Sequence, residues 1–383
     1  MKRKITVTTG TRADYGLLRQ ILHLINSNKN LELYLLVTGM HLSKKHGYTI
    51  HEIKNDGFKI YKKFSMIAKN DDLFNVAFEL GSAISKFSKI FNEIQPDINL
   101  ILGDRDEMLA SALAASHMNI PNAHIHGGDK TKAGIDENNR HAITKLSNIH
   151  FVATNTSKTR VIKMGENPKY VFLTGSPNID EIKQNNISKK IELEKKYKIN
   201  LNDDTLLLVF HPVTTQIDLI SKQIKNILES VVELHKTTIA IVPNSDVGNK
   251  IIFNELTRYS KIHPFIHLYK NVPRNDFLGL LKNSKILLGN SSAGMIEASC
   301  FPIKVINLGI RQEGREHGEN VIHIKNFEKK CIKESMIKIL ETKKKGKLKL
   351  NSIYGDGTSS KKIISYLQKI KIEDQLISKQ IHY

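Results

Sequence analysis

Three loops in the first half of the chain carry side chains that can transfer protons. Residues 103–107 read GDRDE, residues 124–129 read HIHGGD, and residues 134–141 read GIDENNRH. Their candidate acids and bases are Asp104, His126, Asp129, Asp136, Glu137 and His141. Carboxylates and imidazoles are the usual general acids and bases of enzymes. One aspartate before a helix is more simply explained as an N-cap, but three such loops favour proton-transfer chemistry on one substrate.

The second half of the chain offers donors for a nucleotide diphosphate. Residues 289–297 read GNSSAGMIE, and such small residues let backbone and hydroxyl donors approach a pyrophosphate closely. Glu297 follows one turn later, where a carboxylate can accept hydrogen bonds from a ribose diol. Residues 309–316, GIRQEGRE, add two arginines, Arg311 and Arg315. Two further strand ends carry polar residues, at 210–215 (FHPVTT) and 243–246 (PNSD).

The first predicted strand ends in residues 10–16, GTRADYG. This turn opens a helix whose free N–H groups can hold a phosphate, with Arg12 adding charge. It is neither a GxGxxG fingerprint nor a P-loop, and an ordinary strand-to-helix turn explains it about as well. This loop therefore supports a phosphate site only in combination with the other polar loops.

Strands and helices that alternate along the chain must position these loops. The strands predicted in the first half are residues 5–9, 33–38, 98–102, 122–125, 151–154 and 171–174. Those predicted in the second half are residues 206–210, 238–242, 265–267, 286–288 and 304–307. Helical patterns separate them, among others at residues 73–94, 107–118, 217–235 and 273–283. This alternation predicts parallel sheets built from βαβ units.

We therefore predict an α/β protein of two Rossmann-like, doubly wound domains. They cover residues 1–178 and 179–365, and residues 366–383 form a C-terminal tail. The polar, lysine-rich stretch from residue 175 to about residue 202 is predicted to connect the domains. Doubly wound folds bind ligands beyond the carboxyl ends of their strands, so we expect the active site in the cleft between the domains.

Composition limits the classes of protein that fit. Of the 383 residues, 40% are apolar and 25% are charged, which is a globular composition. The lysines behind the net charge of +20 are scattered, and the one dense run, at 343–349, lacks interleaved aromatics. No apolar run reaches the roughly 18 residues of a membrane span, and Cys300 and Cys331 give no zinc spacing. We expect a cytoplasmic protein with no metal, no nucleic-acid partner and no membrane partner.

The polar loops occur in an order that resembles the hydrolysing UDP-N-acetylglucosamine 2-epimerases of sialic acid biosynthesis, including the epimerase half of the bifunctional animal enzyme. The matching signatures, in chain order, are GTRADYGLL, LVTGMHLS, GDRDEMLA, HIHGGD, RHAITKLSNIH, FHPVTT, GNSSAGMIEA and GIRQEGREHGENVIHI. Because they span nearly the whole chain, they are far more specific than any single loop. The resemblance implies a glycosyltransferase-B-like fold.

The resemblance also assigns roles residue by residue. It places the nucleotide site at Arg12, Ala13, Arg105, His211, Asn244, Ser291, Ser292, Glu297 and Arg311. Asp104 and Asp136 match catalytic carboxylates of the family, and Glu137 and His126 complete the catalytic candidates. In the family, the uracil and ribose lie mainly against the second domain, and the sugar reaches the carboxylates of the first.

The implied reaction turns UDP-N-acetylglucosamine and water into N-acetylmannosamine and UDP. UDP leaves by anti elimination to a 2-acetamidoglucal, and water then adds from the face that inverts carbon 2. A base must remove the weakly acidic proton at carbon 2 while cationic donors stabilise the departing pyrophosphate. Because bound UDP is already a good leaving group, neither a metal nor another cofactor is implied. The resemblance also implies a homodimer or homotetramer.

One position departs from the family pattern. Many members carry a glutamate between the histidine-containing strand and the two glycines, where this chain has His126, and Asp129 follows in place of a glutamate. Imidazole can act as acid or base near neutral pH, so His126 is predicted to titrate during catalysis. The alternative is a hydrogen-bonded histidine that only shapes the loop. The change also leaves a related substrate open, such as UDP-N,N′-diacetylbacillosamine.

Other functions match the sequence less well. A non-hydrolysing epimerase, which keeps UDP on its product, typically carries Pro-Glu after the first Thr-Arg, where this chain has Ala13 and Asp14. A glycosyltransferase needs an acceptor and does not explain three acidic loops. A nucleic-acid-binding module would need its positive charge concentrated on one face.

Overall fold

The protein is described from a computed structural model. The structure describes residues 2–44, 47–66, 73–132, 135–184, 187–243, 247–342 and 352–382. The chain forms two compact units. The first comprises Met1–Asp129, Ile135–Asp180 and Tyr354–Tyr383, and the second comprises Lys130–Gly134 and Glu181–Ile353. Within the described ranges, no helix has both the length and the apolar character that crossing a membrane requires.

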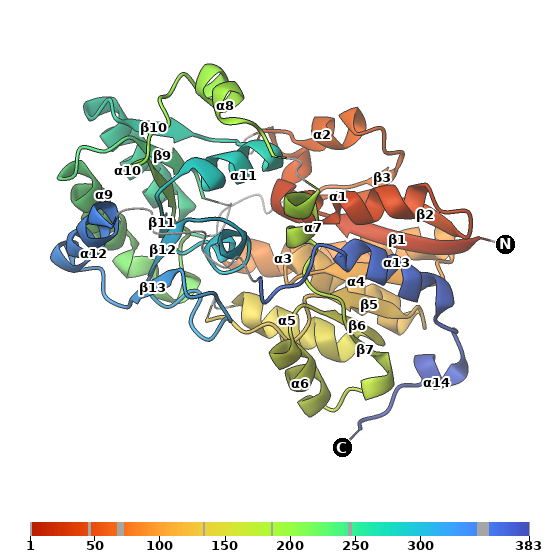
Figure 1. The fold of residues 1–383 in the computed structure, drawn as a ribbon. Coiled ribbons are helices and arrows are strands. Elements are labelled where there is room, and N and C mark those ends of the chain that lie inside the picture. The colour runs from red at the N-terminus through yellow and green to blue at the C-terminus, as the bar shows by residue number, and fades with distance from the viewer. Residues whose placement is uncertain are drawn as a thin grey trace. The chain divides into compact units, whose positions relative to one another are not determined.

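A parallel sheet of seven strands, in the order β3-β2-β1-β4-β5-β6-β7, forms the first unit (Figure 1). The strands are β1 (Arg3–Thr9), β2 (Leu31–Val37), β3 (Ile60–Lys63), β4 (Ile98–Leu102), β5 (Asn122–Ile125), β6 (Ile149–Val152) and β7 (Val171–Leu173). The strand order reverses between β1 and β4, which pair in parallel. Their carboxyl ends therefore meet where doubly wound folds bind ligands.

Helices cover both faces of this sheet. They are α1 (Arg12–Asn26), α2 (Ile50–Asn55), α3 (Leu73–Ile94), α4 (Asp106–His117), α5 (Ile135–Leu146), α6 (Asn155–Lys163), α7 (Asn178–Lys183), α13 (Ser359–Lys369) and α14 (Asp374–Ile377), with the 3₁₀ turns η1 (Gly39–Leu42) and η3 (Pro168–Tyr170). One core cluster joins α1 and α13 to the strands, and another joins α3 and α4. The helix α7 crosses the boundary of the two units.

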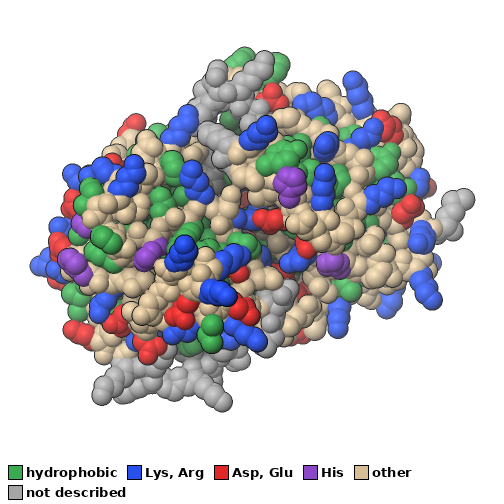
Figure 2. Space-filling model, turned by 90° about the horizontal axis from the view of Figure 1, so that it is seen from above, with side chains coloured by type: hydrophobic (Ala, Val, Ile, Leu, Met, Phe, Trp, Pro, Cys, Tyr) green, Lys and Arg blue, Asp and Glu red, His purple; other side chains and the backbone are tan. Residues whose placement is uncertain are grey.

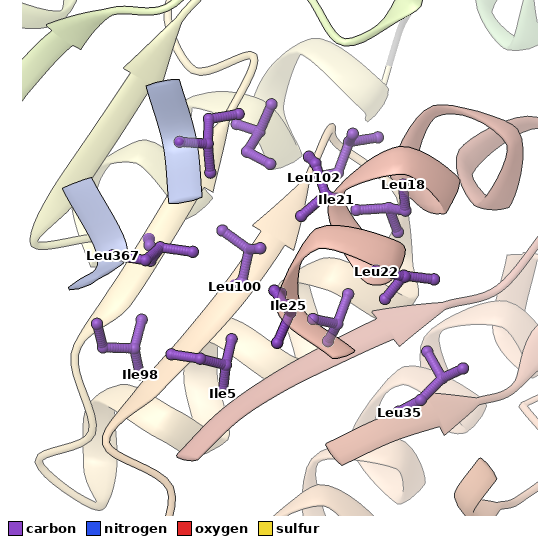
Figure 3. Packing of buried hydrophobic residues seen from close by; sticks show 14 of the residues in the cluster. Ile5, Leu18, Ile21, Leu22, Ile25, Leu35, Ile98, Leu100, Leu102 and Leu367 are labelled. Carbon is purple, nitrogen blue, oxygen red and sulfur yellow. The ribbon is translucent and has the colours of Figure 1, made fainter. Parts of the chain in front are cut away.

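The packing of α1 shows why this segment is helical. Apolar residues recur along it at the three- and four-residue spacing of one helix face. This face consists of Leu18, Ile21, Leu22 and Ile25, all fully buried. Figure 3 shows it packed over Ile5 of β1 and Leu100 of β4, with Leu367 of α13 in the same cluster.

The second unit contains a parallel sheet of six strands, in the order β10-β9-β8-β11-β12-β13. The strands are β8 (Leu206–Val209), β9 (Thr238–Ile241), β10 (Ile266–Tyr269), β11 (Ile286–Gly289), β12 (Lys304–Leu308) and β13 (Val321–Ile324). Its helices are α8 (Lys190–Tyr197), α9 (Ile220–Val232), α10 (Asn249–Ile262), α11 (Arg274–Asn283) and α12 (Lys329–Glu341), with the 3₁₀ turns η4 (Thr214–Leu219), η5 (Ser292–Gly294) and η6 (Glu297–Cys300). Here the strand order reverses between β8 and β11.

The predicted class of two doubly wound parallel α/β units is confirmed, but the C-terminal boundary differs. Residues 354–365 are predicted in the second domain and 366–383 as a tail, whereas the structure places Tyr354–Tyr383 in the first unit. The physical reason is the apolar face of α13, whose Ile363 and Leu367 are buried in the same core as α1. The predicted connection also contains two helices, α7 and α8.

Candidate active site

The carboxyl end of β4 presents the first candidate base. Gly103 follows this strand with a φ of +81°, in the left-handed region that favours glycine, and it turns the chain toward α4. The next residue, Asp104, accepts a hydrogen bond from Nη2 of Arg140, a residue of α5. The Asp104 side chain remains 24% exposed. It is therefore fixed by a cation and still accessible to a substrate.

Arg140 joins several parts of this site. Its buried guanidinium also donates, through Nη1, to the carboxylate of Glu137 and to the backbone carbonyl of Asp129, the latter at 3.2 Å. Burial alone would lower the pKa of Arg140, but the charges of Asp104, Asp129 and Glu137 raise it overall. The guanidinium thus holds Asp104 and Glu137 by charge-assisted hydrogen bonds, which fix the two carboxylates in place.

The first turn of α5 carries the other two candidate carboxylates, Asp136 and Glu137. Glu137 pairs with Arg140 and also contacts Nε2 of His141, one turn later, at 3.1 Å. Asp136 is half-buried on the same turn. The structure thus brings Asp104 and Glu137 to one guanidinium, and α5 carries Asp136 beside them.

Hydrogen bonds engage both ring nitrogens of His126. The residue is buried, and its φ of +69° lies in the left-handed region. Its Nδ1 lies 3.0 Å from Oδ2 of Asp129, and its Nε2 lies 2.9 Å from the hydroxyl of Ser176. Asp129 accepts a further hydrogen bond from the hydroxyl of Ser157, at 2.9 Å. Proton transfer through His126 would disturb one of these contacts, so the geometry supports the loop-shaping alternative.

A second histidine, His124, contacts the backbone of the turn that precedes Asp104. It is fully buried, and its Nε2 lies 2.8 Å from the carbonyl oxygen of Gly103. Its Nδ1 lies 3.2 Å from the hydroxyl of Thr144. Burial lowers the pKa of His124 to about 3, so the imidazole is neutral at physiological pH and acts as a fixed hydrogen-bonding strut.

Asp14 fixes the loop that follows β1. Its carboxylate accepts hydrogen bonds from the backbone N–H groups of Gly10 and Thr11, each at 3.1 Å, and Thr11 caps α1 in return. Burial raises the pKa of Asp14. The nucleotide-site candidates Arg12 and Ala13 occupy the first turn of α1, where backbone N–H groups have no partner within the helix.

Glu107 is a residue of this region to which the sequence analysis assigns no role. It is buried in the first turn of α4 and accepts a hydrogen bond from Nε of Arg105 at 3.3 Å. Its carboxylate packs so closely against the first loop that a Cβ on Gly10 would lie 2.6 Å from Oε1, and Gly39 is equally crowded. Glu107 therefore ties Arg105 to the loop of Arg12. The available sequence signal is its place two residues after Arg105.

In the second unit, Asn290 ties the ends of β8 and β11 together. Its Oδ1 accepts from the backbone N–H of His211 at 2.7 Å, and its Nδ2 donates to the His211 carbonyl at 2.8 Å. The preceding Gly289 lies so close that a Cβ there would be 2.0 Å from the carbonyl oxygen of Val209. The candidate His211 is thus held at the point where the strand order reverses.

The sequence of the small-residue loop after β11 also predicts that a helix opens there, but the structure forms no α-helix at this place. The loop forms two short 3₁₀ turns, η5 and η6, and Ser291 caps the first by accepting from the N–H of Ala293 at 3.3 Å. At Gly294 a Cβ would lie 2.8 Å from the side chain of Val305, so the loop packs directly on β12. Ser291 and Ser292 are both half-buried at the end of β11.

Glu297, the candidate ribose acceptor, is already engaged by a cation of its own unit. Nη1 of Arg274 donates to Oε1 of Glu297 at 2.6 Å, and Nε donates to Oε2 of Glu181 at 3.3 Å. Burial alone would lower the pKa of Arg274, but Glu297 and Glu181 raise it overall. A ribose diol would therefore share Glu297 with Arg274, which the sequence analysis does not single out.

The loop after β12 is attached to the same asparagine as His211. Nη1 of Arg311 donates to the carbonyl of Asn290 at 3.3 Å, and Nε2 of Gln312 donates to it at 3.1 Å. The structure thus groups His211, Ser291 and Arg311 around Asn290. The remaining nucleotide-site candidate, Asn244, lies outside the described residues.

Charges on the surface are mixed in sign. On the face drawn in Figure 2, Lys and Arg side chains are interspersed with Asp and Glu and do not form one continuous patch. The lysine run 343–349 falls outside the described residues. In the part of the chain that the structure describes, no three His, Cys, Asp or Glu side chains are grouped so as to hold a metal ion.

Two doubly wound sheets, with carboxylates at the strand ends of one and polar loops at those of the other, define a glycosyltransferase-B-like α/β protein. The fold is similar to that of a UDP-GlcNAc 2-epimerase from Neisseria meningitidis, solved with UDP-GlcNAc bound. The TM-score is 0.78 and the sequence identity 22%, over 96% of this chain and 100% of that one.

Sequence comparisons identify the family. The model of the family described as UDP-N-acetylglucosamine 2-epimerase matches residues 23–368. A UDP-N,N′-diacetylbacillosamine 2-epimerase (hydrolyzing) from Legionella pneumophila is 38% identical over 379 residues, 99% of each chain. A GDP/UDP-N,N′-diacetylbacillosamine 2-epimerase (hydrolyzing) from Campylobacter jejuni is 36% identical over 323 residues, 84% of each chain. This chain therefore belongs to the UDP-N-acetylglucosamine 2-epimerase family, and the resemblance to its hydrolysing members is confirmed.

Proposed function

We propose that this protein is a hydrolysing UDP-sugar 2-epimerase, which releases UDP from a UDP-2-acetamido sugar and inverts carbon 2. The observation that carries the proposal is the pairing of Asp104 and Glu137 with one buried guanidinium, that of Arg140. It occurs in a chain two of whose relatives, at 38% and 36% identity, are named hydrolysing 2-epimerases.

Asp104 is the base in this proposal. Its partly exposed carboxylate removes the proton at carbon 2, the bond between carbon 1 and the phosphate oxygen breaks, and UDP leaves with that electron pair. A carbon 1–carbon 2 double bond results. Water then adds its hydroxyl group to carbon 1, while an acid on the opposite face, Asp136 or Glu137, protonates carbon 2. The second proton of the water restores that acid, and Asp104 releases to solvent the proton that it removed. One water is consumed, and the products are UDP and the 2-epimer of the sugar.

Each unit has its own candidate donors for the nucleotide, at its own strand ends. In the first unit, we assign phosphate contacts to Arg105 and to the first turn of α1, because Glu107 and Asp14 hold both in place before a ligand arrives. Preorganised donors stabilise a departing oxyanion without reorganising during the reaction. In the second unit, we assign UDP contacts to the group around Asn290.

The sugar that we propose is N,N′-diacetylbacillosamine, in place of the N-acetylglucosamine that the family resemblance implies. Support comes from the two relatives that carry this substrate in their names, one of them matched over 99% of both chains. Both sugars carry the 2-acetamido group next to the leaving UDP, so the same elimination serves either. They differ at carbons 4 and 6, away from the reacting bonds.

Product identification tests the proposal. The protein is incubated with UDP-N,N′-diacetylbacillosamine or UDP-N-acetylglucosamine in D₂O, and the products are separated and identified by NMR and mass spectrometry. We expect free UDP and a sugar that is inverted and deuterated at carbon 2, with the higher kcat/KM for the bacillosamine nucleotide. A product that retains UDP would make the enzyme non-hydrolysing, and unchanged substrates would overturn the proposal. A higher kcat/KM for UDP-N-acetylglucosamine would overturn only the choice of sugar.

Two finer proposals remain, the first from the family resemblance and the second from the sequence pattern. We propose that the enzyme is a homodimer or homotetramer, which sedimentation equilibrium measures directly, and that it works in the cytoplasm on a soluble UDP-sugar. A monomer at micromolar concentration would refute the first of these.

A further inference from the structure

The ammonium group of Lys379 is surrounded by oxygen atoms in the first unit. Its Nζ lies 2.7 Å from Oε2 of Glu166, 2.6 Å from the carbonyl oxygen of Lys145 and 2.7 Å from that of Ser147. An ammonium group has three donors, so these three acceptors use all of them. Lys379 belongs to the C-terminal segment, which we define as residues 374–382.

Two of these acceptors terminate the helix α5. Lys145 and Ser147 flank Leu146, the last residue of this helix. The last carbonyl groups of any helix lack partners within it and must find them elsewhere. The Leu146 carbonyl accepts from Nδ2 of Asn122 at 3.1 Å, and Lys379 serves the carbonyls on either side. A positive charge at this end also interacts favourably with the helix dipole.

Glu166 balances the charge of Lys379. It is buried and accepts from Nζ of Lys145 at 2.6 Å and from Nε2 of His150 at 3.0 Å, in addition to Lys379. Burial alone would raise the pKa of Glu166, but these partners lower it to about 2. Glu166 is therefore an anion at neutral pH, and Lys379 can remain a cation although burial lowers its pKa.

Contacts on both sides of Lys379 hold the C-terminal segment in place. Nδ2 of Asn148 donates to the carbonyl of Leu376 at 2.8 Å, and the backbone N–H of His382 donates to the carbonyl of Gly165 at 3.0 Å. The Leu376 side chain is buried. Lys379 therefore reaches α5 from a firmly attached piece of chain.

We propose that Lys379 is a positioning residue for the reaction, because it fixes the end of α5 opposite to the turn that carries Asp136, Glu137 and Arg140. The proposal rests on the proposed function. Glu137 precedes Lys145 by eight residues, about 12 Å along a helix at 1.5 Å per residue. A helix is rigid over this length, so a displaced C-terminal end displaces the carboxylates as well. Misplacing a reacting group by 1 Å can reduce a rate by about a hundredfold.

The experiment compares three variants of the full chain. Lys379→Met removes the charge and the donors at similar length, Lys379→Arg restores both, and Lys371→Met alters a lysine that is 83% exposed as a matched control. Measurements are kcat and KM below the unfolding transition, and amide hydrogen exchange of α5. For Lys379→Met we expect kcat to fall about 10- to 100-fold, KM to change by less than about threefold, and α5 amides to exchange faster. Lys379→Arg should recover most of kcat, and Lys371→Met should match the parent.

Three results would overturn the proposal. They are a parental kcat in Lys379→Met, a loss of kcat that equals the unfolded fraction, and unchanged hydrogen exchange in α5. If the parent releases no UDP from any UDP-sugar, the proposed function fails instead. Hydrogen exchange then still decides whether Lys379 holds α5 in place.

Discussion

The strand-end loops of the two units differ in how exposed their carboxylates are. In the first unit, carboxylates meet a guanidinium, and Asp104 and Glu137 remain 24% and 19% exposed. In the second unit, the neutral amide of Asn290 bridges the backbone of His211, and the carboxylate of Glu297 is only 4% exposed. Exposed carboxylates can exchange protons with a substrate, whereas a buried carboxylate paired with Arg274 and a neutral amide bridge hold a shape. The contrast favours chemistry at the first set of loops and recognition at the second.

Replacing the first-unit base should have the largest effect. Asp104→Asn keeps the shape of the side chain but removes its basicity, so we expect the rate to fall about 10³-fold, within the range typical of general bases. The affinity for UDP, measured by calorimetry, should change by less than about threefold. Asp106→Asn, in the same loop, is the matched control and should retain activity. If Asp104→Asn reduces the rate and the UDP affinity equally, the first-unit loops do not serve chemistry alone.

The second-unit loops should respond in the opposite way. Arg311→Ala should weaken UDP binding about ten- to a hundredfold, because a charge-assisted hydrogen bond contributes roughly 1.5–3 kcal/mol. Ser292→Ala removes a neutral donor and should cost less, about 0.5–1.5 kcal/mol. Calorimetric titration with UDP measures both. If neither variant weakens UDP, the nucleotide donors have been assigned to the wrong loops.

Acid should loosen the first unit before the second. Burial lowers the pKa of His41 to about 4 and that of His124 to about 3 in the folded protein. In the unfolded chain both histidines have a pKa of about 6.5, so below this pH the unfolded chain binds protons that the folded protein does not. Their contribution to stability is therefore lost between pH 6.5 and these lower values, by about 2 kcal/mol for each residue at pH 5. Hydrogen exchange at pH 7 and pH 5, corrected for intrinsic rates, resolves the two units. His124→Gln should reduce the loss in the first unit, and equal acid sensitivity of both units would contradict the comparison.

The smallest effect is expected at His126. Glutamine can replace its hydrogen bonds to Asp129 and Ser176, so His126→Gln should change the rate by less than about threefold and leave the pH–rate profile unaltered. Rates against pH, measured with the preferred UDP-sugar, provide the test. If His126→Gln instead removes a limb of the pH–rate profile near neutral pH, His126 is one of the catalytic acids and bases of the first unit.

Much of the fold could be predicted from periodicity, because buried parallel strands read as short apolar runs. β4 and β5 match their predicted ranges, and the helix Leu73–Ile94 has the predicted bounds. The edge strands β3 and β13 are missed, because each has only four residues and includes polar ones. Their sequences, IYKK and VIHI, therefore do not form a distinct apolar run. α8 is missed because its lysine-rich sequence buries only Leu193.

The candidate site was predictable in its residues but not in its partners. Asp104 and Glu137 stand out as acids in strand-end loops, and Arg140 follows Glu137 by three residues on one helix, but nothing local indicates that Arg140 also meets Asp104, 36 positions away. The same holds for Arg274, which meets Glu297 from 23 positions away along the chain. Such pairs arise when the sheet brings distant loops together, so one sequence read in order does not reveal them.

The first unit is also the last to be completed during synthesis. Most of the second unit, Glu181–Ile353, lies in the chain before the last stretch of the first unit. Arg3 donates a hydrogen bond to the carbonyl of Leu367 in that last stretch, 364 positions away. A ribosome adding roughly 5–20 residues per second needs about ten to thirty seconds to pass from residue 180 to residue 354. Throughout that interval the face of α1 that will meet α13 stays uncovered on the nascent chain. The second unit can fold meanwhile, and the apolar surface of the waiting first unit is where a ribosome-associated chaperone would bind.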